Sequence, residues 1–143
     1  MAGDDQDWRD RRERAVRAHA DADARVRAAE QATAATLVAR FAAEATGRGL
    51  RPVRLSATSY DGRHHYRTGL TGWYVDRTRT RAVDTRGRFY LLTVPASLRS
   101  LLLGAAPEPS PPPLVIGRGG RDGESMPLEA LLSQRLAAGD DWR

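Results

Sequence analysis

Cysteine and lysine are both absent from this chain of 143 residues, and each absence excludes a class of chemistry. Without cysteine there are no disulfides, no thiolate nucleophile and no cysteine-ligated zinc site. Without lysine the chain lacks the residue that a P-loop places on the terminal phosphates of a nucleotide, and it cannot form a Schiff base. Asparagine is absent too and Ile116 is the only isoleucine, a composition typical of a GC-rich genome.

Long apolar runs are missing as well. The longest aliphatic stretches, Leu101–Leu103 and Leu114–Ile116, are far too short to cross a bilayer. The first ten residues are acidic and contain no apolar run, so they do not resemble a secretory signal. We therefore expect a cytoplasmic protein with one folded core of ordinary size and no membrane partner.

Positive charge is concentrated in the middle of the chain. Residues 51–90, which we call the basic window, hold nine of the 23 arginines against three acidic residues. The residues before the window balance nine arginines with nine acidic residues, and those after it carry five arginines and six acidic residues. Codon bias acts on the whole chain and does not explain this concentration. The window also holds six of the nine aromatic residues: Tyr60, Tyr66, Trp73, Tyr74, Phe89 and Tyr90. Local charge of this kind steers association with a partner.

The first third of the chain predicts one long helix over Asp7–Ala45. This segment contains no glycine or proline and is rich in alanine, the best helix former. Gly47 and Gly49 are expected to end the helix. An acidic residue precedes an arginine by four positions seven times, which supports a helix because such pairs lie one turn apart. The pairs are Asp5–Arg9, Asp7–Arg11, Asp10–Arg14, Glu13–Arg17, Asp21–Arg25, Asp23–Arg27 and Glu44–Arg48.

A helix of about 39 residues is about 60 Å long, roughly twice the width of a small domain. One half is expected to dock on the domain through Leu37, Val38 and Phe41. The other half exposes a thin stripe at spacings of three, four and seven, which consists of Trp8, Ala15, His19, Ala22, Val26 and Ala29. The stripe fits a seam with a second copy or another protein, although its alanines make it weak as a coiled coil. A solvated helix held by its own ion pairs is an equal alternative.

The basic window predicts an antiparallel sheet, because apolar and polar residues alternate over 53–58 as they do in a half-buried strand. Two turns are expected from their residue types: a tight hairpin at Asp61-Gly62, and a type I turn with a glycine bulge over Asp84–Arg88. The remaining elements are a strand over 63–77 with bends or bulges at Gly69 and Gly72, a loop near 77–80, and a last strand over 89–94.

Asp76 and Arg81 flank the loop between the second and third strands and are expected to face each other as an opposite-charge pair. In that register Tyr74, Val83, Phe89 and Leu91 lie on one face, and Trp73, Val75, Ala82, Tyr90 and Leu92 lie on the other. Both faces are apolar, so both should be covered. The expected covers are the docked half of the long helix, a short helix over 96–103 and a last helix over 127–138.

The predicted fold class is therefore α+β: a long N-terminal helix, a four-stranded antiparallel meander and two short C-terminal helices. Residues 1–48 form the charged helix, and residues 49–143 form a small α+β domain. Within that domain a proline-rich connector spans 107–113 and leads into a short strand over 114–116.

Arginine side chains in the sheet region are the best candidates for a binding surface, since guanidinium groups contact phosphates or acidic partners, and Tyr60 or Tyr66 would stack a base. The alternative is that these arginines cap strand edges and pair with acidic residues of the chain itself. The candidates are Arg63, Arg67, Arg77, Arg79, Arg81, Arg86 and Arg88.

Residues 117–123 form a glycine-rich loop that invites a second hypothesis, an anion site. Arg118, Gly119, Gly120 and Arg121 would supply guanidinium and backbone N–H donors. The loop lacks the dinucleotide-binding pattern because Asp122 stands where a glycine is required. The simpler alternative is a turn before the last helix.

The histidines predict no catalytic or metal site. His64 and His65 would point to opposite faces of a strand, so they cannot chelate one metal together. We find no catalytic constellation, expect no cofactor or metal, and do not predict an enzyme. The sequence favours an accessory or adaptor protein that binds another protein, or a second copy, through the long helix and the sheet region. The alternative is nucleic-acid binding at residues 63–88, and an enzyme acting on a phosphorylated small molecule at the glycine-rich loop comes third.

Overall fold

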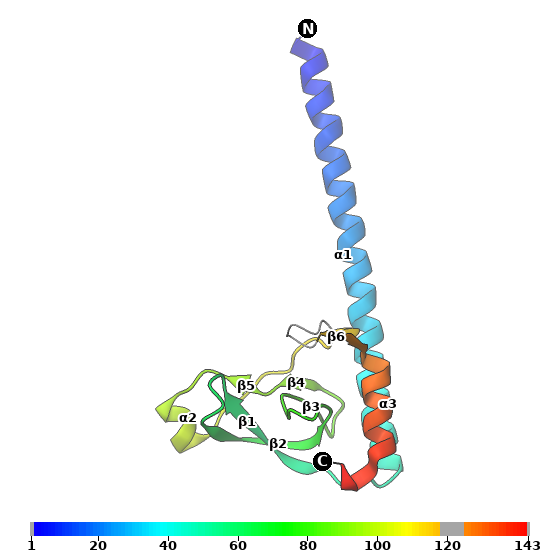
Figure 1. Cartoon of the computed structure of the whole chain (residues 1–143). Coiled ribbons are helices and arrows are strands. Elements are labelled where there is room, and N and C mark those ends of the chain that lie inside the picture. The colour runs from blue at the N-terminus through cyan, green and yellow to red at the C-terminus, as the bar shows by residue number, and fades with distance from the viewer. Residues whose placement is uncertain (1, 118–124, 143) are drawn as a thin grey trace.

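A computed structural model describes residues 2–117 and 125–142, and it has the expected α+β fold (Figure 1). A long helix, α1, extends far beyond the rest of the molecule, while the strands gather beside its C-terminal end. The elements are α1 (Ala2–Gly47), β1 (Val53–Ser59), β2 (His65–Tyr74), β3 (Arg81–Asp84), β4 (Phe89–Leu91), β5 (Thr93–Val94), α2 (Leu98–Leu103), β6 (Val115–Gly117), β7 (Ser125–Pro127), α3 (Leu128–Ala138) and a 3-10 turn, η1 (Gly139–Asp141).

Helix α1 is longer than predicted, with 46 residues and a length of about 69 Å. Its C-terminal end is closed by the chain reversal that the glycines favour. Gly49 has a φ of 73°, and the N–H of Leu50 donates to the carbonyl of Ala45 at 2.9 Å. Of the seven expected acid–arginine pairs, Glu44–Arg48 closes to 3.6 Å. The other six, all within the described helix, do not reach ion-pair distance.

The sheet contains the predicted four-stranded antiparallel meander and one further strand, in the order β4-β3-β2-β1-β5. The expected last strand over 89–94 is divided: β4 pairs with β3, and β5 pairs in parallel with β1. Leu92 joins the two halves, because its N–H donates to Thr80 at 2.8 Å and its carbonyl accepts from Thr58 at 2.7 Å. The short segment that contains β4 and β5 therefore forms both edge strands of the sheet, so the sheet curls back on itself.

The predicted register between β2 and β3 is wrong by one residue. Trp73 pairs with Val83 and Tyr74 with Ala82, so Trp73 and Val75 share a face with Val83 and Phe89. Tyr74 lies instead on the face of Ala82 and Tyr90. The loop between these strands explains the shifted register. Asp76 accepts hydrogen bonds from the N–H groups of both Thr80 and Arg81, instead of lying directly opposite Arg81 as expected.

Two clusters of buried side chains form the core, one on each face of the sheet. The larger cluster joins the sheet to α1 and α3, and at its centre Phe41 packs edge-on against Trp73, with ring centroids 5.9 Å apart and planes at 87°. The smaller cluster lies inside the curl of the sheet and contains Leu55, Ala82, Tyr90 and Leu92. The sheet thus covers its second face largely by itself.

Helix α2 does not cover the sheet, contrary to expectation. None of its six residues is buried, and Leu98, Leu102 and Leu103 are between 74% and 80% exposed. It begins with Ser97, whose hydroxyl accepts from the N–H of Ser100, and it ends at Gly104. Because the curled sheet covers this face with its own residues, α2 does not pack on it, and the leucines of α2 are exposed to solvent.

The C-terminal third packs back onto the docked part of α1. The expected short strand appears as β6, which pairs with β7 in a two-stranded sheet. The N–H of Leu128 donates to the carbonyl of Leu114 at 2.7 Å and fixes the start of α3. Leu128 and Leu132 of α3 are buried in the larger cluster. No helix in the described part of the chain combines the length and apolar character needed to cross a membrane.

The core divides α1 into two parts. Its buried residues all lie between Ala34 and Ala45, and residues 2–33 are exposed throughout. We call residues 2–33 the projecting segment. The last third of the helix belongs to the same core as the sheet, so the fold of residues 49–143 is completed by residues that precede them.

We expect Gly72→Ala to destabilise the fold strongly. Gly72 is buried in β2, and a Cβ there would collide with the carbonyl oxygen of Val83 and approach the Cα of Asp84 to 2.6 Å. Forcing two paired strands apart costs about 2 kcal/mol or more, measurable by urea unfolding. Gly47→Ala is the matched control, since a Cβ at Gly47 meets nothing within 4 Å. Equal stability of the two variants would contradict the strand packing described.

Candidate functional site

The seven arginines of the predicted basic surface occupy three separate places. Arg63 and Arg67 lie at the β1–β2 turn and the start of β2, Arg77, Arg79 and Arg81 at the β2–β3 loop, and Arg86 and Arg88 at the β3–β4 turn. The seven residues of β2 that follow Arg67 separate the first group from the second by about 23 Å. The structure therefore does not bring the seven together in one patch.

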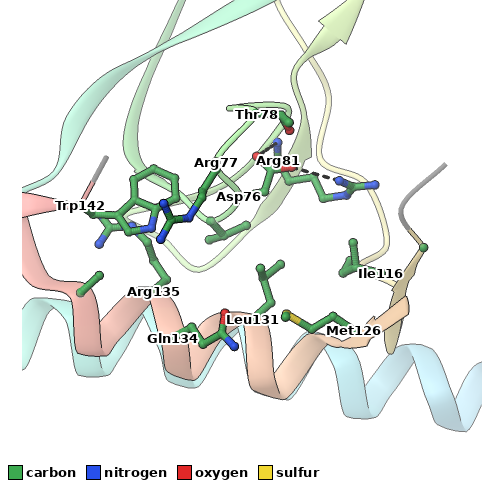
Figure 2. A pocket seen from close by; sticks show the side chains of 13 residues that line it. Asp76, Arg77, Thr78, Arg81, Ile116, Met126, Leu131, Gln134, Arg135 and Trp142 are labelled. Atoms are coloured by element: carbon green, nitrogen blue, oxygen red, sulfur yellow. Dashed lines mark hydrogen bonds and ion pairs between the residues drawn. The ribbon is translucent and has the colours of Figure 1, made fainter. Parts of the chain in front are cut away.

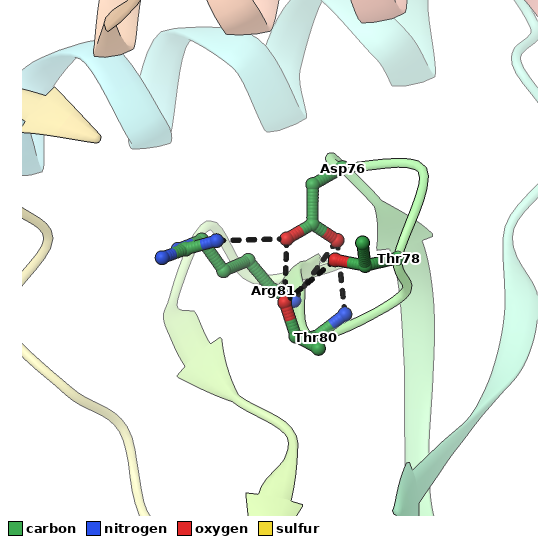
Figure 3. A network of polar contacts seen from close by, with 4 residues as sticks. All are labelled: Asp76, Thr78, Thr80 and Arg81. Atoms are coloured by element: carbon green, nitrogen blue, oxygen red, sulfur yellow. Dashed lines mark hydrogen bonds and ion pairs between the residues drawn. The ribbon is translucent and has the colours of Figure 1, made fainter. Parts of the chain in front are cut away.

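Arg81 is held by the carboxylate of Asp76 in the network of Figure 3. Its Nη1 donates to Asp76 Oδ2 at 3.0 Å, and the hydroxyl of Thr80 donates to the same oxygen at 2.6 Å. Asp76 Oδ1 accepts from the backbone N–H groups of Thr80 and Arg81 at 2.9 and 3.2 Å. This network lets Arg79 adopt a φ of 59°, with its guanidinium 5.5 Å from the centre of the Tyr74 ring.

Arg88 is held in the same way by Asp84, which is buried at the β3–β4 turn. Arg88 Nε donates to Asp84 Oδ2 at 2.8 Å, and the Tyr90 hydroxyl donates to that oxygen at 3.2 Å. The hydrogen bond to Asp84 raises the pKa of the Arg88 guanidinium above its ordinary value. Burial, followed by the charge of Asp84, raises the pKa of the Tyr90 hydroxyl. Both pairs are made within the basic window and do not involve acidic residues of α1.

Several arginines of the basic window remain open to solvent. Arg63, Arg67 and Arg86 are exposed, and their side chains make no hydrogen bond or ion pair within the part of the chain that the structure describes. Tyr60, beside Arg63 in the β1–β2 turn, is 71% exposed. Tyr66 is buried, and its hydroxyl accepts from the N–H of Ser97 at 3.1 Å, so it is not available to stack a base.

The two adjacent histidines contact different neighbours. His64 stacks against Tyr66, with ring centroids 6.4 Å apart, and His65 Nδ1 lies 3.2 Å from the hydroxyl of Thr58. Nowhere in residues 2–117 and 125–142 do three histidine, aspartate or glutamate side chains gather as a metal site requires. The predicted anion loop, Arg118, Gly119, Gly120 and Arg121, lies outside the described residues.

A cavity of about 570 Å³ lies between the β2–β3 loop, the β6–β7 sheet and α3 (Figure 2). Its apolar wall comes from Val75, Ile116, Met126 and Leu131, and Trp142 borders it near the C-terminal end of α3. Among the described residues, three guanidinium groups line it, from Arg77, Arg81 and Arg135, and one carboxylate, that of Asp76. We call this space the α3 cavity.

Arg135 is the residue at this cavity that sequence reasoning missed. It is 7% exposed, and its Nε and Nη1 donate to the carbonyls of Tyr74 and Gly139 at 2.8 and 2.9 Å. Its guanidinium lies 4.6 Å from the centre of the Trp142 ring. Burial lowers the pKa of Arg135 from its ordinary value, and the charge of Asp140 acts against that shift. The signal was available, since Leu128, Leu132 and Arg135 follow the spacing of one buried helix face.

The projecting segment of α1 and the leucines of α2 are the exposed apolar surfaces that stand out. Trp8, Val16 and Val26 are 60%, 62% and 57% exposed along the segment. Arg12 lies against Trp8, with its guanidinium 5.3 Å from the ring. Single exposed apolar side chains are common on protein surfaces, whereas contiguous ones, such as the neighbouring leucines of α2, are typical of surfaces that bind another molecule.

No known family, no curated protein and no solved structure matches this chain.

We expect Asp76→Asn to destabilise the protein by about 2 kcal/mol, because the amide cannot accept all four hydrogen bonds and leaves Arg81 without its counter-charge. Chemical denaturation measures the change. Thr78→Ala is the control in the same loop, since Thr78 contacts the hydroxyl of Thr80 at 2.9 Å but not the carboxylate. A loss in Asp76→Asn no larger than in Thr78→Ala would contradict the role given to this network.

Proposed function

We propose that this protein is a non-catalytic adaptor that acts by binding another protein through the projecting segment of α1. The observation that carries the proposal is the exposure of every residue from 2 to 33 on a helix whose last third is anchored in the core. An isolated helix of this kind gains most of its stability by packing an apolar stripe against a partner. From this anchor the first two thirds of α1 extend away from the domain (Figure 1).

The partner that the stripe fits is another helix. Eight residues recur at alternating spacings of four and three, as in the a and d positions of a coiled coil. We call them the seam, and they are Trp8, Arg12, Ala15, His19, Ala22, Val26, Ala29 and Thr33. Large and small side chains alternate irregularly along this seam, which suits a partner of complementary size.

A second copy in antiparallel orientation supplies that complement. Trp8 then lies opposite Thr33 of the other chain, Arg12 opposite Ala29, His19 opposite Ala22, and Val26 opposite Ala15, so every large residue meets a small one. Arg9 and Glu30, which flank the seam, face each other across it and attract. A parallel pair would place Arg12 against Arg12 and His19 against His19, which favours the antiparallel arrangement.

We expect Ala15→Gln/Ala22→Gln to weaken self-association by about tenfold or more, because long side chains at close-packed positions keep the helices apart. Sedimentation equilibrium over a range of protein concentrations measures the effect. Ala20→Gln/Ala24→Gln makes the same change on the opposite face of the helix and should leave association unchanged. A full-length protein that stays monomeric at every concentration would exclude a second copy as the partner.

Disulfide trapping tests the orientation of the two helices. The chain has no native cysteine, so only the introduced cysteines can form a disulfide. In Trp8→Cys/Thr33→Cys, an antiparallel pair joins position 8 of one chain to position 33 of the other. A parallel pair joins like positions instead, and peptide mapping separates the two outcomes.

Nucleic-acid binding is the second candidate, and the exposed Tyr60 beside Arg63 and Arg67 is the feature that favours it. Its site would be the β1–β2 turn rather than the whole basic window, since Arg81 and Arg88 are already paired.

We expect single-stranded DNA to bind only weakly and without a stacking contribution, so that Tyr60→Ala leaves the affinity unchanged in fluorescence anisotropy at fixed salt. A base stacked on Tyr60 contributes about 1–3 kcal/mol. A loss of affinity of that size in Tyr60→Ala, together with a weaker salt dependence in Arg63→Gln/Arg67→Gln, would favour this second candidate instead.

A further inference from the structure

Arg135 carries a buried positive charge that the described part of the chain does not neutralise by an ion pair. Its two side-chain hydrogen bonds to described residues go to uncharged backbone carbonyls, and no carboxylate of these residues lies within ion-pair distance of it. Asp140 acts on it at longer range, while Asp140 itself accepts from the N–H of Arg51 at 2.7 Å. Burying an unpaired guanidinium is costly, so its position calls for an explanation beyond packing.

Packing accounts for only part of that position. The carbonyl of Gly139 lies at the C-terminal end of α3, where a positive charge is favourable, and the Trp142 ring adds a cation–π contact. These contacts use Nε, Nη1 and one face of the guanidinium. Nη2 makes no hydrogen bond to the described residues. It is the donor left for a ligand.

The α3 cavity beside Arg135 has two kinds of wall. Figure 2 shows Arg135, Arg77 and Trp142 on one side and Ile116, Met126 and Leu131 along the other. Asp76 does not neutralise Arg135, because its carboxylate is bound by Arg81 and Thr80. A volume of about 570 Å³ lies within the range of small-molecule sites, which are mostly apolar with a few placed polar groups.

We propose that the α3 cavity binds a small amphipathic anion, a molecule with one carboxylate or phosphate group on an aliphatic or aromatic body. The anionic group accepts from Arg135 Nη2 and neutralises the buried charge, and the body lies against Ile116, Met126 and Leu131. The hydrogen bonds of Nε and Nη1 to backbone carbonyls and the stacked indole fix the guanidinium before the ligand arrives, which reduces the entropy lost on binding. This site is independent of the helix seam.

The test is a calorimetric titration of the full chain with three probes of equal chain length below their micellar concentrations: decanoate, decyl phosphate and decanol. We expect at least one anion to bind about tenfold or more tightly than decanol, since a hydrogen bond to a charged group contributes at least that factor. The tighter of the two anions identifies the head group. Decanol binding as tightly as both anions, or no binding of either anion, overturns the proposal.

Variants locate the site. Arg135→Gln removes the charge, and Met126→Trp fills the cavity from a partly buried position while leaving Arg135 in place. Both should weaken anion binding about tenfold or more, and Arg86→Gln, which removes an exposed arginine far from the cavity, should not. Unchanged anion binding in folded Arg135→Gln or Met126→Trp overturns the proposal. If Arg135→Gln fails to fold, Met126→Trp and the comparison of anion with alcohol decide.

Discussion

The contact of Trp73 with the end of α1 is the interaction on which the rest of the structure depends. The indole of Trp73 packs edge-on against Phe41 and donates from Nε1 to the carbonyl of Leu50 at 3.2 Å, so it holds both the last turns of the helix and the chain that leaves it. Because β2 lies at the centre of the sheet, this one side chain fixes the helix relative to every strand. Because α1 is one unbroken helix and only its last third is anchored, its first two thirds project.

The charged residues of the projecting segment and those of the sheet are arranged differently. Acidic and basic residues alternate along the projecting segment and keep it solvated without closing many ion pairs. Within the sheet, two buried or half-buried aspartates, Asp76 and Asp84, each organise a turn and bind one arginine. The excess positive charge of the basic window is therefore partly structural, and the open arginines Arg63, Arg67 and Arg86 are divided between the start of β2 and the β3–β4 turn. Arg135 differs from these arginines, because its charge is buried beside a cavity and its hydrogen bonds go to backbone carbonyls.

Much of the fold could be predicted because local chemistry decides it. The alanine content predicted the position of the long helix, and the sequences Asp61-Gly62 and Asp84–Gly87 predicted the positions of two turns. The register between β2 and β3 could not be predicted, because it depends on which N–H groups the side chain of Asp76 accepts from. The exposure of α2 followed from the curl of the sheet, a long-range event that rests on Leu92 bonding to both edges. The spacing of Arg135 from Leu128 and Leu132 placed it on the apolar face of its helix, but the cavity beside it depends on where the β2–β3 loop and the β6–β7 sheet lie, which the sequence does not show.

The central claim is that α1 has two roles, an anchor over residues 34–47 and a partner-binding segment over residues 2–33. Amide hydrogen exchange followed by mass spectrometry, at several protein concentrations, tests it most directly. The account predicts that residues 34–47 are strongly protected at every concentration, because the core holds them. It predicts that residues 2–33 exchange quickly in dilute protein and become protected as the concentration rises. Protection that is uniform along the whole helix and independent of concentration would contradict the account.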